Sequence, residues 1–261
     1  MKGDGFLRAL GRGALGQLNQ NAGAFALLGR ALRGAGALAS PPVRSVFFRQ
    51  VYFTGLQALA RTGLIGALTG IVILTQAASL VGKNAALGGQ VLVWAVMREI
   101  GPLFAAIAVI SRSSSAVAAE LAAMRVNREM EVLRGLGIDP LRYLIVPRVL
   151  GLAASLAALT VWFETVSIAG GLALSSLIVG LPFLAQLHNI AGALSAADIG
   201  ISVLKSAVFG LLVAAAACNQ GLQAGSSITE IPQVTTRAVM QALSLVVVAN
   251  VLLTVLAAPL R

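Results

Sequence analysis

The chain has 261 residues, of which 58% are hydrophobic and only 11% are charged, and its mean hydropathy is +0.90. Soluble domains carry about 25% charged residues, so this composition excludes a soluble globular protein and predicts an all-α integral membrane protein. In a soluble protein a net charge of +10 would indicate binding to nucleic acid. Here the basic residues lie at the ends of apolar runs, where they set membrane topology, so we expect no nucleic-acid partner.

Residues 1–61 form a basic region that we expect on the cytoplasmic side of the membrane. It carries eight basic residues against one acidic residue, Asp4, and an excess of Lys and Arg marks cytoplasmic segments. Phe25, Leu28 and Leu32 recur at helical spacing. This pattern predicts an amphipathic helix in the headgroup region, with a loosely ordered basic tail as the alternative.

Five apolar runs have about the 20 residues that a helix needs to cross a bilayer. The predicted spans are 62–81, 90–110, 149–170, 199–218 and 238–258, within a membrane domain over residues 62–258. Gly66 and Gly70 form a GxxxG pair in the first span, which allows close helix contact. We expect the third apolar run to break at Gly170-Gly171 and at Gly180-Leu181-Pro182, and Asp198 to lie in the following outer loop. An odd number of spans puts the two ends of the chain on opposite sides.

Polar residues inside the spans are candidates for a binding site, because charges at membrane depth usually face a cavity or a partner helix. Arg98 and Glu99 are adjacent in the second span. Lys205 lies in the fourth span, and Gln76 lies near the outer end of the first. These residues could line a polar cavity or only fix helix packing. Lys205 could snorkel outward or attract an anionic headgroup into the same cavity as Arg98.

Residues 111–148 form a charged segment between two apolar runs and hold ten of the chain's 28 Asp, Glu, Lys and Arg residues. Residues 116–133 are strongly helix-forming and predict a single helix. Gly135-Leu136-Gly137 should end it, and Asp139-Pro140 should start the next helix, with Asp as the cap and Pro in the first turn.

The chain carries no motif for hydrolysing a nucleotide itself. Gly82-Lys83 lacks the GxxxxG spacing of a phosphate-binding loop, and neither HExxH nor GxSxG occurs. The single cysteine, Cys218, excludes an intrachain disulfide and a cysteine-rich metal site. A separate soluble protein could therefore act on the charged segment, where Met130 and Leu133 would offer apolar contacts to a groove.

Three stretches carry a resemblance to the MlaE/YrbE permease family of ABC transporters. They are ELAAMRVNREMEVLRGLGIDPLRYLIVPR (residues 120–148), MREIGP (97–102) and TTRAV (235–239). The resemblance extends over nearly the whole chain. It implies a homodimeric five-span subunit of the bacterial inner membrane, with its N-terminus in the cytoplasm and its C-terminus in the periplasm.

The same resemblance implies the partners and the cargo. Two copies of a cytoplasmic MlaF-like ATPase would carry ATP and magnesium, so this chain needs no cofactor and is not itself an enzyme. A periplasmic MlaD-like hexamer with MCE domains would sit on the outer face. The cargo would be phospholipid, or a related lipid, moved between the inner and outer membranes of a Gram-negative envelope.

Site residues follow from the resemblance by position. Residues 127–136 would be the coupling helix received by the ATPase. The coupling residues implied are Asn127, Glu129, Met130, Glu131, Leu133 and Asp139. The residues that match polar positions around a lipid cavity at the dimer axis are Gln76, Arg98, Glu99 and Lys205. The chain departs from the family pattern at Asn127 and Arg128, where the family has a TEQIDAL-like run, and at GSSITEIPQV, where a GGAxGVGRA-like run is usual.

Two other functions fit the sequence less well. An ion-coupled secondary transporter of an amphipathic substrate would need inverted half-repeats and intramembrane carboxylates. Five spans do not divide into such halves, and only Glu99 and Glu164 are suitable carboxylates. A membrane enzyme acting on lipids would need a nucleophile and a base, and the sequence shows no such pair.

Overall fold

The computed structural model describes residues 3–81, 85–178, 183–225 and 227–257, and over these residues the chain is helical without a strand. Five helical segments are long and apolar enough to cross a membrane: Pro41–Ala77, Gln90–Val126, Leu141–Ala173, Ala196–Leu222 and Ile228–Ala257. The predicted all-α membrane fold is confirmed. Ala258, the last residue of the predicted fifth span, lies outside the described residues.

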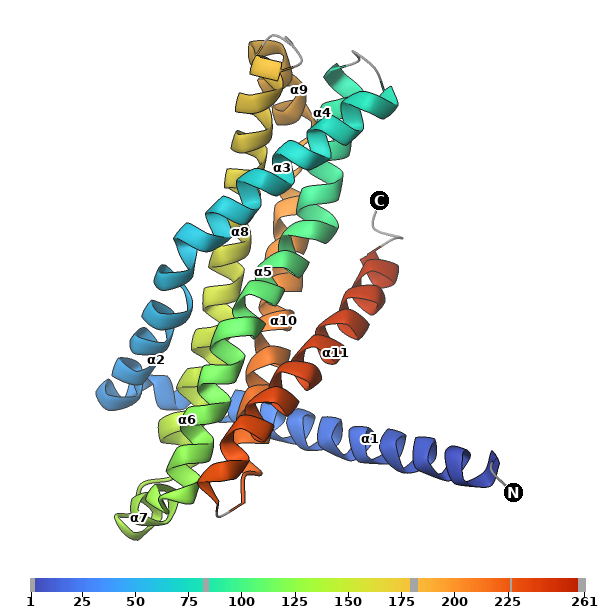
Figure 1. The fold of residues 1–261 in the computed structure, drawn as a ribbon. Helices are drawn as coiled ribbons and strands as arrows, with labels where there is room; N and C mark the ends of the chain where they lie inside the picture. Colours follow the sequence, from blue (N-terminus) through green and yellow to red (C-terminus); the bar gives the residue numbers. More distant parts are fainter. Residues whose placement is uncertain (1–2, 82–84, 179–182, 226, 258–261) are drawn as a thin grey trace.

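The first half of the described chain contains six helices, which Figure 1 shows from blue to green. They are α1 (Gly3–Arg33), α2 (Pro41–Thr54), α3 (Leu59–Val81), α4 (Ala85–Ala95), α5 (Gly101–Val109) and α6 (Ser115–Val126). Two π-helical turns, Val96–Ile100 and Ile110–Ser114, join α4 to α5 and α5 to α6. The second candidate span is therefore one continuous helical rod with two wide turns.

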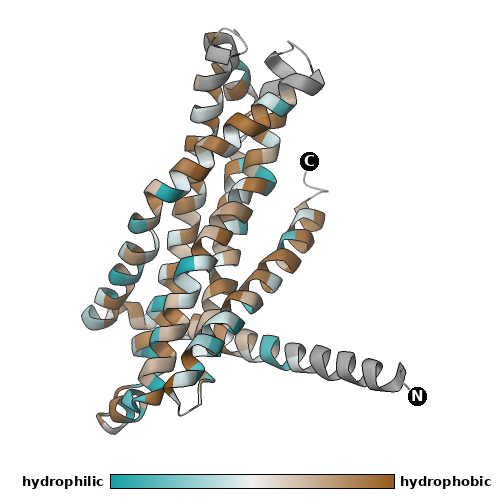
Figure 2. Cartoon of the chain, in the orientation of Figure 1, coloured by the Kyte–Doolittle hydropathy of each residue, from teal (hydrophilic) through white to brown (hydrophobic). Residues whose placement is uncertain are grey.

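The second half of the described chain supplies five further helices. They are α7 (Glu129–Gly135), α8 (Val146–Ile178), α9 (Phe183–Ala193), α10 (Ala196–Leu222) and α11 (Ile231–Ala257). Hydrophobic residues run along the long helices, and hydrophilic residues gather at the end of the bundle where α7 lies (Figure 2). We call this end the α7 end.

The core of the bundle lies around α8 and α10. In the most apolar part of the span that contains α8, 72% of the residues are buried, against 22% for the span that contains α11. Figure 1 shows α11, in red, leaning away from the other long helices toward its carboxyl end. In this carboxyl half, its exposed large apolar residues are Val247, Val248, Val251, Leu252, Val255 and Leu256.

The GxxxG pair of the first span packs against α8 of the same chain. A Cβ atom on Gly70 would lie 1.8 Å from the carbonyl oxygen of Ser167, and one on Gly66 would lie 2.9 Å from that of Phe163. The break expected at Gly170-Gly171 is wrong, since α8 continues through both residues. The break expected at Gly180-Leu181-Pro182 lies outside the described residues. Gly170 and Gly171 instead let α3 approach, because a Cβ on Gly170 would lie 3.0 Å from the Cα of Ala67.

Helix α1 lies across the foot of the bundle (Figure 1) and is docked there by side-chain amides. The amide of Asn219 donates to the backbone oxygen of Gln20 at 3.1 Å. Gln220 donates to the side-chain oxygens of Gln20 at 3.3 Å and Gln241 at 2.8 Å. Gln241 in turn donates to Asn21 at 3.1 Å. Residues around 20 are therefore an ordered helical part of the bundle and not a loose tail.

Candidate functional site

Within the charged segment, the stretch that the sequence predicts to be one helix, residues 116–133, forms two helices. Helix α6 ends at Val126, and Asn127 leaves the helical conformation. Arg128 adopts the left-handed conformation, with φ 58°, directly before α7. This conformation costs a non-glycine residue about 1–2 kcal/mol, so the packing around α7 must hold it there. The single helix expected over residues 116–133 is therefore wrong.

The end of α7 follows the prediction. Gly137 has φ 76°, its N–H bonds the oxygen of Arg134, and the N–H of Ile138 bonds the oxygen of Leu133. These two bonds form the Schellman motif that glycine favours. The side chain of Asp139 then accepts from the N–H of Leu141 at 3.0 Å. The predicted stop and the predicted Asp cap are confirmed.

Met130 does not offer the apolar contact that the sequence suggested. It is 7% exposed and packs into the main hydrophobic core, and Leu133 packs partly against that core. Val132 and Leu136 are the exposed apolar residues of this turn, at 59% and 70%. The other predicted coupling residues, Asn127, Glu129, Glu131 and Asp139, are exposed. The expectation for Met130 is corrected, because its side chain anchors α7 to the bundle.

A pocket of about 830 Å³ lies beside α7. Its charged lining residues are Arg30, Arg125, Arg128, Arg134, Glu131 and Asp139. The excess of arginines makes this a basic recess at the end of the bundle.

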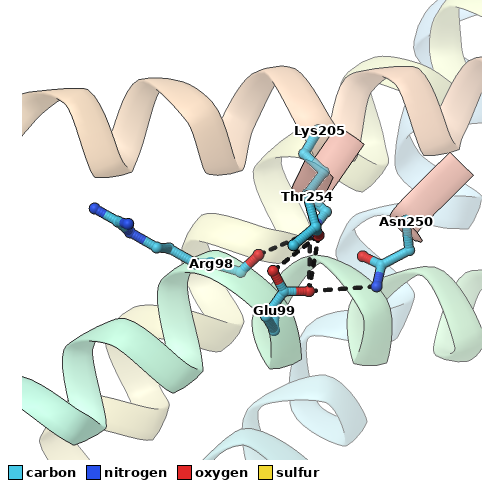
Figure 3. A network of polar contacts seen from close by, with 5 residues as sticks. All are labelled: Arg98, Glu99, Lys205, Asn250 and Thr254. Carbon is cyan, nitrogen blue, oxygen red and sulfur yellow. Dashed lines mark hydrogen bonds and ion pairs between the residues drawn. The ribbon is translucent and has the colours of Figure 1, made fainter. Parts of the chain in front are cut away.

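The intramembrane charges form one polar cluster between α10, α11 and the π-helical turn at Val96–Ile100 (Figure 3). The ammonium of Lys205 lies 3.1 Å from Oε2 of Glu99. It also donates to the backbone oxygen of Arg98 at 2.9 Å and to the hydroxyl of Thr254 at 3.0 Å. The Lys205 side chain is 4% exposed, so it does not snorkel outward.

Glu99 is held by α11 as well. The Thr254 hydroxyl donates to its Oε1 at 2.9 Å, and the Asn250 amide donates to its Oε2 at 3.3 Å. Thr254 thus accepts from Lys205 and donates to Glu99, as a hydroxyl can. The amide oxygen of Asn250 is buried and accepts no hydrogen bond within the described residues.

The backbone around Pro102 explains why the cluster forms here. The N–H of Gly101 bonds to the oxygen of Val96, five residues back, as in a π-helix. Pro102 has no N–H to donate to the carbonyl of Arg98, four residues back. That carbonyl is therefore free to accept the ammonium of Lys205.

Arg98 and Glu99 are neighbours in sequence but pair with different helices. The guanidinium of Arg98 lies 2.6 Å from Oδ1 of Asp198, in the first turn of α10. Asp198 is 7% exposed, so its assignment to an outer loop is wrong. It is buried because it neutralises Arg98.

A pocket of about 190 Å³ opens beside the cluster. Its polar lining is Arg98, Glu99, Lys205 and Thr254, and its apolar lining is Ile201, Leu204, Leu253, Leu256 and Ala257. Leu204 and Leu256 are 65% and 68% exposed, so the walls of the pocket continue into the apolar outer surface. This arrangement suits a ligand with a charged head and a hydrocarbon body.

Three of the four predicted cavity residues therefore come together, and the fourth does not. Gln76 lies on α3 with its side chain exposed and does not line this pocket. Asn250 and Thr254 were missed, although their spacing of four residues in the last apolar run places them on one helix face. Glu164 is 2% exposed, accepts from the hydroxyl of Ser202, and lies outside the pocket lining.

Comparison with known proteins gives a family match and several relatives. The family described as Permease MlaE matches residues 47–256. A probable ABC transporter permease protein of Rickettsia felis is 27% identical over 238 residues, 90% of this chain and 91% of the relative. A probable ABC transporter permease protein of Synechocystis sp. is 30% identical over 204 residues, 77% of each chain. The chloroplastic protein TRIGALACTOSYLDIACYLGLYCEROL 1 of Arabidopsis thaliana is 35% identical over 172 residues, 66% of this chain and 49% of the relative.

Proposed function

Because the chain belongs to the MlaE permease family, we propose that it is the membrane subunit of an ABC transporter that moves phospholipid, or a related lipid, between the inner and outer membranes of a bacterial envelope. The chain is a membrane permease by its family and its five candidate spans. Relatives named as probable ABC transporter permeases imply a separate ATPase partner. ATP and magnesium would bind that partner.

The pocket beside Lys205 is the observation that carries the lipid assignment. It combines charges at membrane depth with apolar walls that open toward the lipid-facing surface. A phospholipid has the same division into a charged head and a hydrocarbon body. The name of the Arabidopsis relative, which is that of a galactolipid, gives independent support to lipid as the cargo.

A second copy of the chain would complete this site. Pockets for drug-sized ligands have about 300–1,000 Å³, so 190 Å³ accommodates a headgroup but not a whole lipid. Helix α11 lines the pocket and leaves an apolar face uncovered. A symmetric partner packed on this face would cover it and enlarge the pocket. This reasoning supports a homodimer with the lipid site near its axis.

Coupling to the ATPase would pass through the α7 end, which we assign to the cytoplasmic side of the inner membrane. Val132 and Leu136 offer exposed apolar contacts, and Glu129 and Glu131 carry exposed charge just before Val132. Helix α6, next to this turn, is the end of the rod that carries Glu99. Closure of paired ATPases would push α7, tilt the rod and shrink the pocket, which would release the lipid toward an MCE-domain hexamer at the periplasmic end.

Reconstitution tests this proposal. The chain is placed in liposomes with its ATPase and its MCE partner, and ATP-dependent transfer of a labelled phospholipid is measured. Arg98→Ala and Glu99→Ala are each expected to lower the transfer rate at least about tenfold, the factor for one lost interaction of about 1.4 kcal/mol. Arg44→Ala removes an exposed arginine that does not line this pocket, and as the control it should transfer at the normal rate. Full transfer by both variants would show that Arg98 and Glu99 do not bind the cargo. Transfer driven by an ion gradient without ATP would overturn the assignment to an ABC transporter.

A further inference from the structure

A second basic pocket lies at the α7 end, away from the cluster around Lys205. It has about 430 Å³ and lies between α2, the α6 region and the start of α8. Its charged lining residues are Arg49, Arg112, Arg148 and Glu120. It shares no lining residue with the pocket beside Lys205, so it is a separate site.

The arginines of this pocket have donors that the protein does not use. Arg148 is 4% exposed, and its Nη2 pairs with Oε1 of Glu120 at 2.7 Å. Its Nη1 is buried and finds no hydrogen-bond partner among the described residues. The same holds for Nη1 of Arg112, whose Nη2 donates to the side-chain oxygen of Gln57. Buried charged donors without an acceptor are rare in native proteins, so these two donors call for acceptors from outside the described chain.

The charge balance identifies the ligand as an anion. Three arginines against one glutamate leave the pocket with a net charge of about +2, and arginine binds phosphate oxygens with its paired N–H donors. Arg49 is exposed and lies 5.7 Å from the centre of the Phe53 ring, which positions its guanidinium at the pocket edge. The site therefore matches a phosphate group.

The surroundings identify the source of that phosphate. Helix α2 exposes three aromatic residues, Phe48, Tyr52 and Phe53, at 61%, 53% and 45%. Exposed aromatic residues gather at the depth of the lipid headgroups. Basic pockets between membrane helices at this depth bind the headgroups of acidic lipids. The pocket thus opens where a lipid phosphate, fixed in the leaflet, is present at high local concentration.

We propose that the pocket between α2, α6 and α8 binds the phosphate of an anionic phospholipid from the leaflet at the α7 end. This lipid is a resident of the site and not the transported cargo. Its phosphate supplies the acceptors that Arg112 and Arg148 lack, and it ties α2 to the α6–α8 contact. Because α6 leads into α7, the bound lipid stiffens the region on which the soluble partner would act.

Lipid binding to the purified chain in detergent tests this proposal. Native mass spectrometry is run with phosphatidylglycerol, with zwitterionic phosphatidylcholine of the same acyl chains, and with inorganic phosphate alone. Phosphatidylglycerol is expected to bind at least tenfold more tightly than phosphatidylcholine. Arg49→Gln and Arg112→Gln should each weaken its binding about fivefold, the factor that corresponds to about 1 kcal/mol per arginine near a membrane surface.

Two control variants show whether the lipid binds in this pocket or elsewhere on the chain. Arg44→Gln removes an exposed arginine of α2 that does not line the pocket, and it should bind phosphatidylglycerol normally. Lys205→Met alters the other pocket, which would hold the cargo, so any loss of lipid that it causes should add to the loss caused by Arg112→Gln. Equal binding of the two lipids, or normal binding by both Arg49→Gln and Arg112→Gln, would overturn the proposal. Inorganic phosphate that binds as tightly as the lipid would assign the pocket to free phosphate instead.

Discussion

We expect the removal of Glu99 and the removal of Lys205 to lower the stability of the fold by different amounts, although the two residues form one ion pair. Glu99→Gln leaves the ammonium of Lys205 without its counter-charge, although this side chain is only 4% exposed. Lys205→Met leaves Glu99, which is 30% exposed and keeps its hydrogen bonds from Thr254 and Asn250. We therefore expect Glu99→Gln to be the more destabilising change.

The magnitudes follow from the burial of the charge that remains. Removing one partner of a buried pair costs about 3–5 kcal/mol, mostly because the other charge stays buried. Glu99→Gln should lie at the upper end, at about 4–5 kcal/mol, and Lys205→Met below this range, at about 2–3 kcal/mol, since Glu99 is partly solvated. The double variant carries no buried charge and should lose only about 1–2 kcal/mol, less than either single variant.

The single cysteine provides the assay. Cys218 is 0% exposed, so a thiol-reactive fluorophore labels it only when the bundle opens. Thermal unfolding in detergent should place Glu99→Gln about 4 °C below Lys205→Met, at about 2 °C per kcal/mol for a chain of this size and a difference of about 2 kcal/mol. Equal midpoints, the reverse order, or a double variant as unstable as the sum of the two single variants would refute the reasoning.

Further predictions concern the rest of the bundle. Gly70→Ala should lower the unfolding midpoint in the same thiol assay by about 2–6 °C, because the new Cβ would meet the carbonyl of Ser167 and overpacking by one methyl costs about 1–3 kcal/mol. Gly29→Ala, with nothing within 4 Å, should leave the midpoint unchanged. Equal shifts in the two variants would contradict the close crossing of α3 and α8. Leu136→Asp removes an exposed apolar side chain of the α7 turn. It should weaken co-purification of the ATPase about tenfold, which corresponds to about 1.4 kcal/mol, and leave the unfolding midpoint normal. Undiminished binding would show that the ATPase does not contact Leu136. Gln220→Leu breaks one hydrogen bond to Gln20 of α1 and one to Gln241 of α11. It should accelerate hydrogen exchange of the docked part of α1 about fivefold, at about 1 kcal/mol for the one bond to α1. Unchanged exchange would show that this amide does not hold α1.

The fold was predictable because its signals are local. Apolar runs of bilayer length predict helices without any tertiary information. The stop at Gly137 and the cap at Asp139 depend on the backbone freedom of glycine and on a side chain that reaches two residues along the chain. Each of these features is encoded within a few residues, so each could be derived from the sequence.

The features that the sequence missed depend on distant partners. Asp198 is buried because Arg98, one hundred positions earlier, neutralises it, and nothing in its own neighbourhood indicates this. The break between α6 and α7 occurs in strongly helix-forming sequence. The left-handed Arg128 stands next to α7, and Met130 of α7 is anchored in the main core. Tertiary packing thus overrides local helix propensity there.

The site residues also divide into those that the sequence alone indicated and those that only the structure shows. Arg98, Glu99 and Lys205 could be grouped because intramembrane charge is rare and must be compensated. Asn250 and Thr254 carry no charge, so a search for intramembrane charges did not find them. Only the arrangement of α11 against the π-helical turn shows that they complete the cluster.

The low burial of α11 has a consequence for the hydrogen bonds of the charged cluster. Asn250 and Thr254 both belong to this least enclosed of the long helices, so any displacement of α11 removes two donors from Glu99 and one acceptor from Lys205 together. The ammonium of Lys205 would keep its ion pair with Glu99 but would hold one N–H without an acceptor, ready to donate to the oxygen of an incoming anionic group. The position of one helix thereby sets how many hydrogen-bond donors face the mouth of the pocket.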